Sequence, residues 1–253
     1  CTIGQLLREK AESQPDIDAC VYPDRKLRYS YKQFNEVCEK AAKGFMSLGI
    51  EKGEHVAIWA TNTPEWLITQ FSTGKMGAVL VTVNTNYRAK ELEFLLKQSD
   101  STTLILMESF KTHSYIETLY KIVPELRGAE PGKLISPKLP NLKNIIVLGE
   151  KRYPGTFSWD DVMEGSGRIS DDVYLERYNS LHPGDVINMQ YTSGTTGFPK
   201  GVMLTHHNII NNARNIAACM NLGNHDRMCI PVPFFHCFGC VLGTMACVTA
   251  GST

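Results

Sequence analysis

The chain has 253 residues, 43% of them hydrophobic and 21% charged, and its 26 basic and 26 acidic side chains give a formal net charge of zero. This length accommodates one large α/β domain or two smaller ones, with the composition of an ordinary soluble protein. Because there is no long run of either charge, the bulk charge gives no support to nucleic-acid binding and leaves open only a local basic patch.

Helix and strand patterns alternate along the first half of the chain, which predicts βαβ units and a largely parallel sheet. Ser30 and Gln33 form a capping-box pattern before an apolar helical stripe that ends near Gly49, and Pro64 suits the first turn of the next helix. Further helices are expected over residues 3–13, 90–98 and 113–123. Strands are expected over residues 19–22, 27–31, 55–60, 78–83 and 102–107.

The second half of the chain begins less regularly. Several prolines and charges between residues 124 and 143 predict an exposed connection, and 144–148 reads as a strand. Residues 149–185 are polar and irregular, with one short helix near 159–163, and a boundary between two subdomains is expected near 150–185. A strand over 186–191 and an apolar run over 202–204 follow, and Thr205 is the expected N-cap of a helix from about His207. The predicted fold class is α/β, with layered, largely parallel sheets flanked by helices.

The eight cysteines are scattered along the chain, which favours reduced thiols in a cytosolic setting over a disulfide framework. Cys237 and Cys240 have a C-x-x-C spacing, but neither a second ligand pair nor a thioredoxin-like context accompanies them. We interpret them as core cysteines and predict no metal site.

The segment from Met228 to Thr253 contains no charged residue and is long enough to span a bilayer. Pro231, Pro233 and Gly239 interrupt a continuous apolar helix, so a buried strand, a loop and a core helix are the preferred interpretation. No signal-peptide pattern follows Cys1. We predict a cytoplasmic protein without a transmembrane span, and leave peripheral membrane association and organelle import open.

The most informative segment is residues 192–201, which read Thr-Ser-Gly-Thr-Thr-Gly-Phe-Pro-Lys-Gly. Glycines allow the backbone to approach a ligand closely, hydroxyl and backbone N–H groups can donate to phosphate oxygens, and Lys200 adds a compact positive charge. A Walker A loop requires glycine directly before the lysine and a hydroxyl residue after it, whereas Pro199 and Gly201 stand there. The segment therefore predicts polyphosphate binding of another kind.

Residues 191–201 resemble the phosphate-loop motif of the adenylate-forming superfamily, which includes acyl-CoA synthetases, aryl-CoA ligases, luciferases and adenylation domains of peptide synthetases. Residues 233–239, Pro-Phe-Phe-His-Cys-Phe-Gly, resemble the superfamily's aromatic and histidine motif beside the acyl pocket. Residues 27–67 and 77–99 resemble its N-terminal subdomain. The resemblance spans nearly the whole chain, is greatest to medium-chain fatty acyl-CoA synthetases, and implies that residues 1–253 form an incomplete N-terminal adenylating domain, without the C-terminal domain.

In this superfamily a carboxylate attacks the α-phosphate of ATP to give an acyl-adenylate and pyrophosphate, and a thiol, usually that of coenzyme A, then displaces AMP. The resemblance implies ATP, Mg²⁺ and coenzyme A as cofactors and a fatty acid as the substrate. The residues that it implies for the ATP phosphates are Thr192, Ser193, Gly194, Thr195, Thr196, Gly197, Phe198, Pro199 and Lys200. Those that it implies for catalysis are Lys200 and Thr196. Those that it implies for the acyl substrate are His236, Phe234, Phe235 and Phe238.

Several alternatives stay open at this point. The chain could belong to an aryl-acid CoA ligase of the 4-coumarate type, an adenylation domain that loads a carrier protein, or a non-catalytic binding module. Lys200 could be a solvated charge and His236 a satisfied core histidine, while the phenylalanines are expected in the core in any case. Because the superfamily's adenine, ribose and magnesium motifs and its C-terminal catalytic lysine lie beyond residue 253, we expect weak or no nucleotide affinity and no turnover from this chain alone. Its oligomeric state is unknown.

Overall fold

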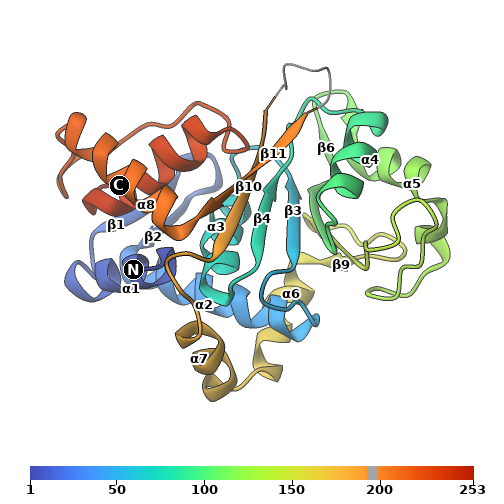
Figure 1. The fold of residues 1–253 in the computed structure, drawn as a ribbon, viewed down its shortest axis with the longest axis horizontal. Helices are drawn as coiled ribbons and strands as arrows, with labels where there is room; N and C mark the ends of the chain where they lie inside the picture. The colour runs from blue at the N-terminus through green and yellow to red at the C-terminus, as the bar shows by residue number, and fades with distance from the viewer. Residues whose placement is uncertain (193–198) are drawn as a thin grey trace.

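A seven-stranded sheet runs through the centre of the computed structural model, which describes residues 1–192 and 199–253 (Figure 1). The strand order is β11-β10-β4-β3-β5-β8-β9, and each neighbouring pair is parallel except β10 and β11. Its strands are β3 (His55–Trp59), β4 (Val79–Thr82), β5 (Thr103–Met107), β8 (Asn144–Leu148), β9 (Phe157–Ser158), β10 (Val186–Thr192) and β11 (Lys200–Thr205). Two antiparallel hairpins lie outside it, β1 (Asp18–Tyr22) with β2 (Leu27–Ser30) and β6 (Ser109–Phe110) with β7 (His113–Ser114). This mixed, largely parallel sheet confirms the predicted α/β class.

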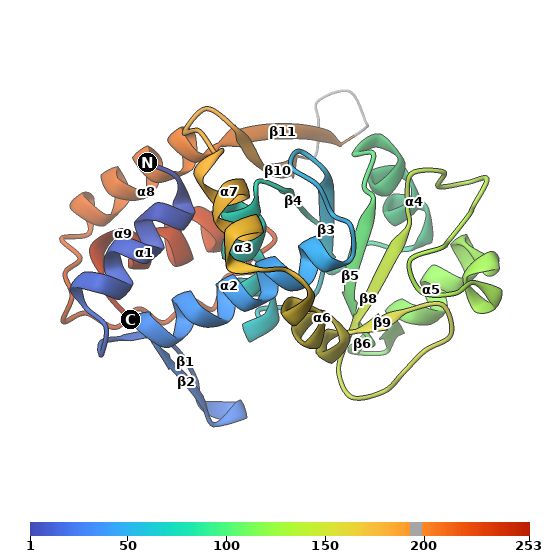
Figure 2. The ribbon, with the colours of Figure 1, turned by 90° about the horizontal axis from the view of Figure 1, so that it is seen from below.

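Helices cover both faces of the sheet (Figures 1 and 2). They are α1 (Ile3–Ser13), α2 (Tyr31–Ser47), α3 (Pro64–Met76), α4 (Ala89–Gln98), α5 (Tyr115–Ile122), α6 (Trp159–Gly165), α7 (Asp171–Asn179), α8 (His206–Cys219) and α9 (Ala246–Ala250). Side chains of each strand alternate between the two faces. Val56 and Ile58 of β3 join the core that α1, α2 and α3 cover, whereas Ala57 and Trp59 join the core beneath α4 and α5.

The local signals at the helix starts are confirmed. Ser30 and Gln33 form the predicted capping box at the start of α2, and Pro64 is the first residue of α3. Thr205 caps α8 and forms a capping box with Asn208. These caps satisfy N–H groups that have no partner within the helix, so they fix where each helix begins.

Two stretches are more ordered than the sequence predicted. The connection between α5 and β8 is not simply exposed, because it contains a short 3₁₀ helix (Pro124–Gly128) and buries Leu126, Leu134, Leu139 and Leu142 in the core. The segment expected to be irregular contains α7, which was missed. Few residues of α7 are apolar, and the helix is anchored to the core by two buried tyrosines on one face, Tyr174 and Tyr178.

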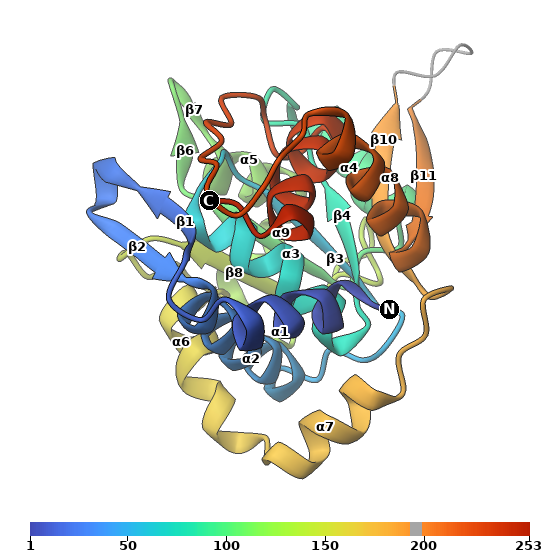
Figure 3. The same cartoon turned by 90° about the vertical axis from the view of Figure 1, so that its left-hand side faces the viewer.

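The segment over 228–253 lacks the predicted strand. Pro231 and Pro233 have no N–H to donate to a β ladder, and residues 228–237 form an irregular segment that leads into a π-helix (Phe238–Met245) and α9. In the described ranges, no helix has the length and apolar character needed to cross a bilayer. The end of the segment lies beside the β1–β2 hairpin (Figure 3), where the Tyr31 hydroxyl donates to the Ser252 carbonyl at 2.7 Å.

A partly buried ionic cluster around Lys75, which the sequence did not reveal, joins α1, α2, α3 and α7. The Lys75 side chain on α3 is fully buried, and its Nζ donates to Asn35 Oδ1 at 2.7 Å and to Glu39 Oε1 at 3.2 Å. Arg8 donates to the same Glu39 oxygen at 3.3 Å and lies 4.1 Å from the centre of the Tyr178 ring. Burial lowers the pKa of Lys75 although Glu39 opposes it. For Glu39, burial alone would raise the pKa, but Lys75 and Arg8 outweigh it and the pKa is lowered.

Candidate functional site

The predicted phosphate-binding segment lies between the two antiparallel strands of the sheet. β10 ends at Thr192 and β11 begins at Lys200, and these two residues face each other in the register (Figure 1). Of the predicted site residues, Ser193, Gly194, Thr195, Thr196, Gly197 and Phe198 lie outside the described residues. Thr192 and Lys200 are exposed and Pro199 is half-buried. The structure therefore brings the two ends of the motif together at the carboxyl end of β10.

Lys200 combines three properties that suit an anionic ligand. It is exposed, it follows the carboxyl end of a strand that is parallel to β4, and it forms no ion pair with any described residue. Ligands of open α/β sheets bind outside the carboxyl ends of the strands. Among the described residues, the Lys200 ammonium group has no acidic partner at this end of the sheet.

His206, the first residue of α8, connects this region to the N-terminal helix. Its Nδ1 accepts a hydrogen bond from the Ile3 backbone N–H at 3.1 Å, and the side chain is fully buried. Burial lowers the pKa of His206 to about 4, so the ring is neutral at pH 7. Because His207 is exposed, the two adjacent histidines point in different directions, as expected at a helix start.

The pH dependence of folding should report on His206. Its pKa in the folded chain, about 4, lies below the ordinary 6.5, so the unfolded chain binds more protons between these values. Stability is therefore greatest above pH 6.5 and falls as the pH drops from 6.5 towards 4. We expect the free energy of unfolding, measured by urea titration, to be about 2 kcal/mol lower at pH 5 than at pH 7.5.

The His206→Gln variant should lose most of this pH difference, whereas the matched His207→Gln variant of the exposed neighbour should keep it. An unchanged pH dependence in His206→Gln would show that the buried imidazole is not the group that titrates.

The segment that precedes the π-helix is fixed by Asn62, which follows β3. Asn62 Nδ2 donates to the Val232 carbonyl at 2.9 Å and to the Ile230 carbonyl at 3.3 Å, and Asn62 Oδ1 accepts from the Phe234 N–H at 2.8 Å. One carboxamide thus satisfies three backbone groups of a segment that forms no sheet ladder. This positioning residue was missed, because nothing local in the sequence distinguishes Asn62 from a turn asparagine.

The four residues predicted to contact the acyl substrate are not gathered in one place. His236 is exposed, and its Nδ1 lies 3.2 Å from the Phe238 N–H, which donates to it. The alternative of a core histidine is therefore wrong. Phe238 is 54% exposed, so the expectation that every phenylalanine here lies in the core is also wrong. Phe235 is half-buried, and Phe234 is buried against Trp66 with 5.3 Å between the ring centres.

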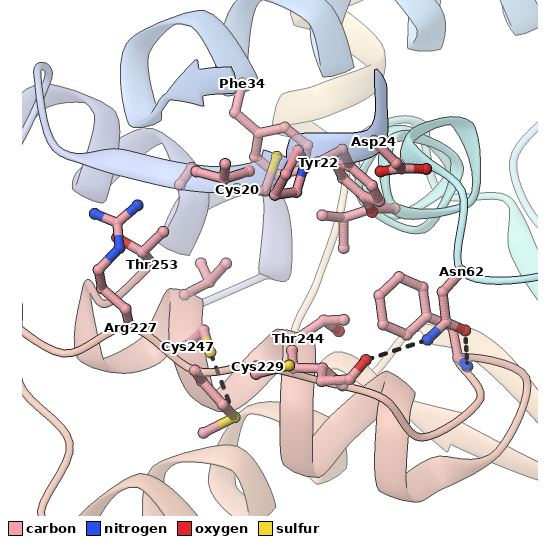
Figure 4. A pocket seen from close by; sticks show the side chains of 18 residues that line it. Cys20, Tyr22, Asp24, Phe34, Asn62, Arg227, Cys229, Thr244, Cys247 and Thr253 are labelled. Carbon is pink, nitrogen blue, oxygen red and sulfur yellow. Dashed lines mark hydrogen bonds between the residues drawn. The ribbon is translucent and has the colours of Figure 1, made fainter. Parts of the chain in front are cut away.

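Two hollows flank the segment over 228–248. The first is a cavity of about 520 Å³ between the β1–β2 hairpin and the end of the described chain, with Cys20, Asn62, Phe234 and Cys247 among its lining residues (Figure 4). The second, which we call the α8 groove, has a volume of about 650 Å³ and lies between α8 and the π-helix. Its walls include His207, Asn208, Asn211, Asn212 and Asn215 on α8, Leu204 on β11, and Cys237, Val241 and Leu242 opposite.

The C-x-x-C pair is divided between solvent and core. Cys237 is exposed, whereas Cys240 is buried and burial raises its pKa to about 12. Asn188 and Gln70 place side-chain nitrogens 3.8 and 3.4 Å from the Cys240 sulfur. The interpretation as a core cysteine is thus right for Cys240 and wrong for Cys237. Within residues 1–192 and 199–253, no group of three or more His, Cys, Asp or Glu side chains is arranged to hold a metal ion.

Comparison with curated proteins gives long matches. The chain is 59% identical to YngI of Bacillus subtilis (strain 168), provisionally named an acyl-CoA synthetase, over 251 residues that cover 99% of this chain and 46% of that protein. It is 39% identical to the mitochondrial medium-chain acyl-CoA ligase ACSF2 of Homo sapiens over 259 residues, which cover 100% of this chain and 42% of that protein. The chain therefore spans less than half of the length of these relatives.

Comparison with solved structures also finds matches that cover the whole of this chain. The inhibitor-bound N-terminal domain of FACL13 from Mycobacterium tuberculosis matches with a TM-score of 0.76 at 26% identity, covering 100% of this chain and 56% of that one. The anthranilate CoA ligase AuaEII in complex with anthranoyl-AMP matches in fold alone, with a TM-score of 0.79 at 23% identity over 100% of this chain and 44% of that one. The sequence pattern of the family described as AMP-binding enzyme matches residues 7–253. The chain therefore belongs to the AMP-binding enzyme family, and its curated relatives are acyl-CoA synthetases.

Proposed function

We propose that the protein containing this chain is an ATP-dependent fatty acid–CoA ligase. The observation that carries this proposal is the position of Lys200, which forms no ion pair with the described residues, relative to the α8 groove. Lys200 begins β11 and Leu204, four residues along the same strand, lines the groove. At about 3.3 Å per residue, the two positions are about 13 Å apart. That separation suits one substrate whose phosphates lie at Lys200 and another whose carboxylate enters from the groove.

The proposed reaction has two balanced steps. A carboxylate oxygen attacks the α-phosphorus of ATP, the bond to the bridging oxygen breaks, and pyrophosphate leaves. The thiol of coenzyme A then gives up its proton to solvent and attacks the acyl carbonyl, the bond from the carbonyl carbon to the AMP oxygen breaks, and AMP leaves as the C–S bond forms. The Lys200 ammonium stabilises the negative charge that gathers on the departing pyrophosphate, which is preorganised electrostatic catalysis. Thr192 and the proposed phosphate residues 193–198, with Thr196 as a catalytic member, would complete the anion site.

His236 and the exposed Phe238 are the proposed contacts of the reacting carboxylate and its first carbons, since Cys237 between them lines the α8 groove. Phe235 is proposed beside them, and Phe234 faces the cavity on the other side of the segment. Because Mg²⁺ commonly binds through substrate phosphates with one or two carboxylates, we propose that it enters with ATP.

The substrate class is tested by acid-dependent exchange of labelled pyrophosphate into ATP, with the full-length protein and carboxylates of graded chain length beside benzoate and coumarate. We expect exchange with fatty acids and an optimum at medium chain length, because the relative from Homo sapiens bears that name. Exchange that is fastest with the aryl acids would identify an aryl-acid ligase instead. Exchange with fatty acids without transfer to coenzyme A would point to a carrier-protein acceptor, and absence of exchange with every acid would leave a binding module.

A further inference from the structure

The α8 groove has one mainly polar wall on α8 and one mainly apolar wall opposite. Asn208, Asn211, Asn212 and Asn215 are spaced at i, i+3, i+4 and i+7 on α8, so their carboxamides form one stripe along the helix. All four line the groove. Ile209 is the one apolar α8 residue among the described lining residues, and the opposite wall contains Val241 and Leu242 from the π-helix. An acyl chain in the groove would therefore contact hydrocarbon on one side and a row of carboxamides on the other.

The stripe differs from an ordinary solvated helix face in composition. Such faces usually carry Lys, Glu and Arg, which combine charge with good helix propensity. Asparagine is a weaker helix former, because its side chain competes for backbone hydrogen bonds. The stripe nevertheless consists of four asparagines without a charged residue among them. A neutral set of donors and acceptors suits a neutral polar ligand group better than an ionic one.

Two of the four carboxamides already have partners. Asn208 Oδ1 accepts from the Thr205 N–H at 3.0 Å in the capping box, and Asn211 Nδ2 lies 2.9 Å from His207 Nε2. The side chains of Asn212 and Asn215 form no hydrogen bond with the described residues, and both are exposed in the groove. A plain alkyl chain would displace water from them without offering hydrogen bonds, whereas an oxygen on the chain would restore those bonds.

We infer that the acyl group accepted by the α8 groove carries a hydroxyl or oxo substituent that bonds to Asn212 and Asn215. This inference rests on the proposed function, since it names the substrate class of the same ligase. Asn212 and Asn215 are specificity-determining residues in this proposal. They lie one helical turn apart, so an oxygen placed along a medium-length chain can bind one or both.

The test compares kcat/KM for pyrophosphate exchange by the full-length protein with decanoate and with hydroxydecanoates hydroxylated at successive positions. We expect at least one hydroxydecanoate to exceed decanoate about tenfold, because one or two neutral hydrogen bonds contribute about this much. In the Asn212→Leu/Asn215→Leu double variant the ratio should fall to one or below, while exchange with decanoate is kept or increased. The Asn212→Gln/Asn215→Gln variant, which retains the carboxamides, should preserve a preference for a hydroxylated acid.

Asn179→Leu, at an exposed helical asparagine on α7 outside the groove, serves as the matched control and should leave the ratio unchanged. If wild type uses decanoate as well as or better than every hydroxydecanoate, the inference is overturned while the fatty acid–CoA ligase stands. If the double leucine variant keeps the wild-type ratio, the asparagines are not the determinants and the inference is likewise overturned. If no acid supports exchange, the proposed function itself fails and the inference fails with it.

Discussion

Replacing Lys200 by alanine should lower the rate of acid-dependent pyrophosphate exchange by about 10²–10³, because the loss of one preorganised donor to a developing anion has this effect. Lys200 is suited to that role since it is exposed at the carboxyl end of β10 and forms no ion pair with the described residues. The change should act mainly on kcat, because negative charge on the leaving pyrophosphate increases from the ground state to the transition state. The KM for the carboxylic acid should change little, since we propose that the acid enters from the α8 groove, which Lys200 does not line.

The matched control for this prediction is Lys138→Ala, which removes another exposed lysine from a position outside the sheet. It should leave kcat and KM as in wild type. Lys200→Arg keeps the charge but not the compact ammonium, and should recover part of the rate. A Lys200→Ala variant with wild-type kcat would show that Lys200 is a solvated surface charge. The position of Lys200 would then no longer support the proposed function.

Much of the fold could be predicted because its signals are local. The capping box at Ser30, Pro64 at the first position of α3 and the apolar runs of β3, β4 and β5 each depend on a few neighbouring residues. The four buried leucines between residues 124 and 143 gave no such signal, because they are separated by prolines and polar residues and meet only in the folded core. The same holds for α7, whose helix is stabilised by two tyrosines that pack on other helices.

The candidate site also combines features that have a local sequence signal with features that depend on contacts between distant residues. The predicted phosphate-binding segment is singled out by its order of hydroxyl residues, glycines and a lysine. Most of it lies outside the described residues, and its role in binding phosphate stays a prediction. Asn62 is separated by about 170 residues from the segment that it fixes, and the partner of His206 is at the other end of the chain. The α8 groove likewise depends on α8 and the π-helix coming together. Such contacts between distant residues cannot be read from periodicity or spacing. The subdomain boundary near residues 150–185 stays a prediction.

Replacing Glu39 by leucine should lower the free energy of unfolding by about 3–5 kcal/mol at pH 7, because it leaves the ammonium of Lys75 buried without its counter-charge. Lys75 would keep Asn35 Oδ1, at 2.7 Å, as a neutral acceptor. Removal of Glu39 should lower the pKa of Lys75 further, since this carboxylate now opposes the effect of burial. A lowered lysine pKa means that the unfolded chain binds more protons, so stability rises with pH. The deficit of Glu39→Leu relative to wild type should therefore shrink between pH 7 and pH 9.5.

The Glu39→Leu/Lys75→Met double variant tests whether the unpaired ammonium of Lys75 causes the loss of stability in Glu39→Leu. Replacing both members of a buried pair by apolar side chains is often neutral, whereas removing one partner is not. We therefore expect urea titrations of the double variant to recover most of the stability that Glu39→Leu loses, and to show no pH-dependent deficit relative to wild type. Recovery would mean that the ion pair of Glu39 and Lys75 adds little net stability to the fold. If the double variant is as unstable as Glu39→Leu, the loss comes instead from the contacts of Glu39 with Arg8 and Asn35, and the buried charge of Lys75 is not its cause.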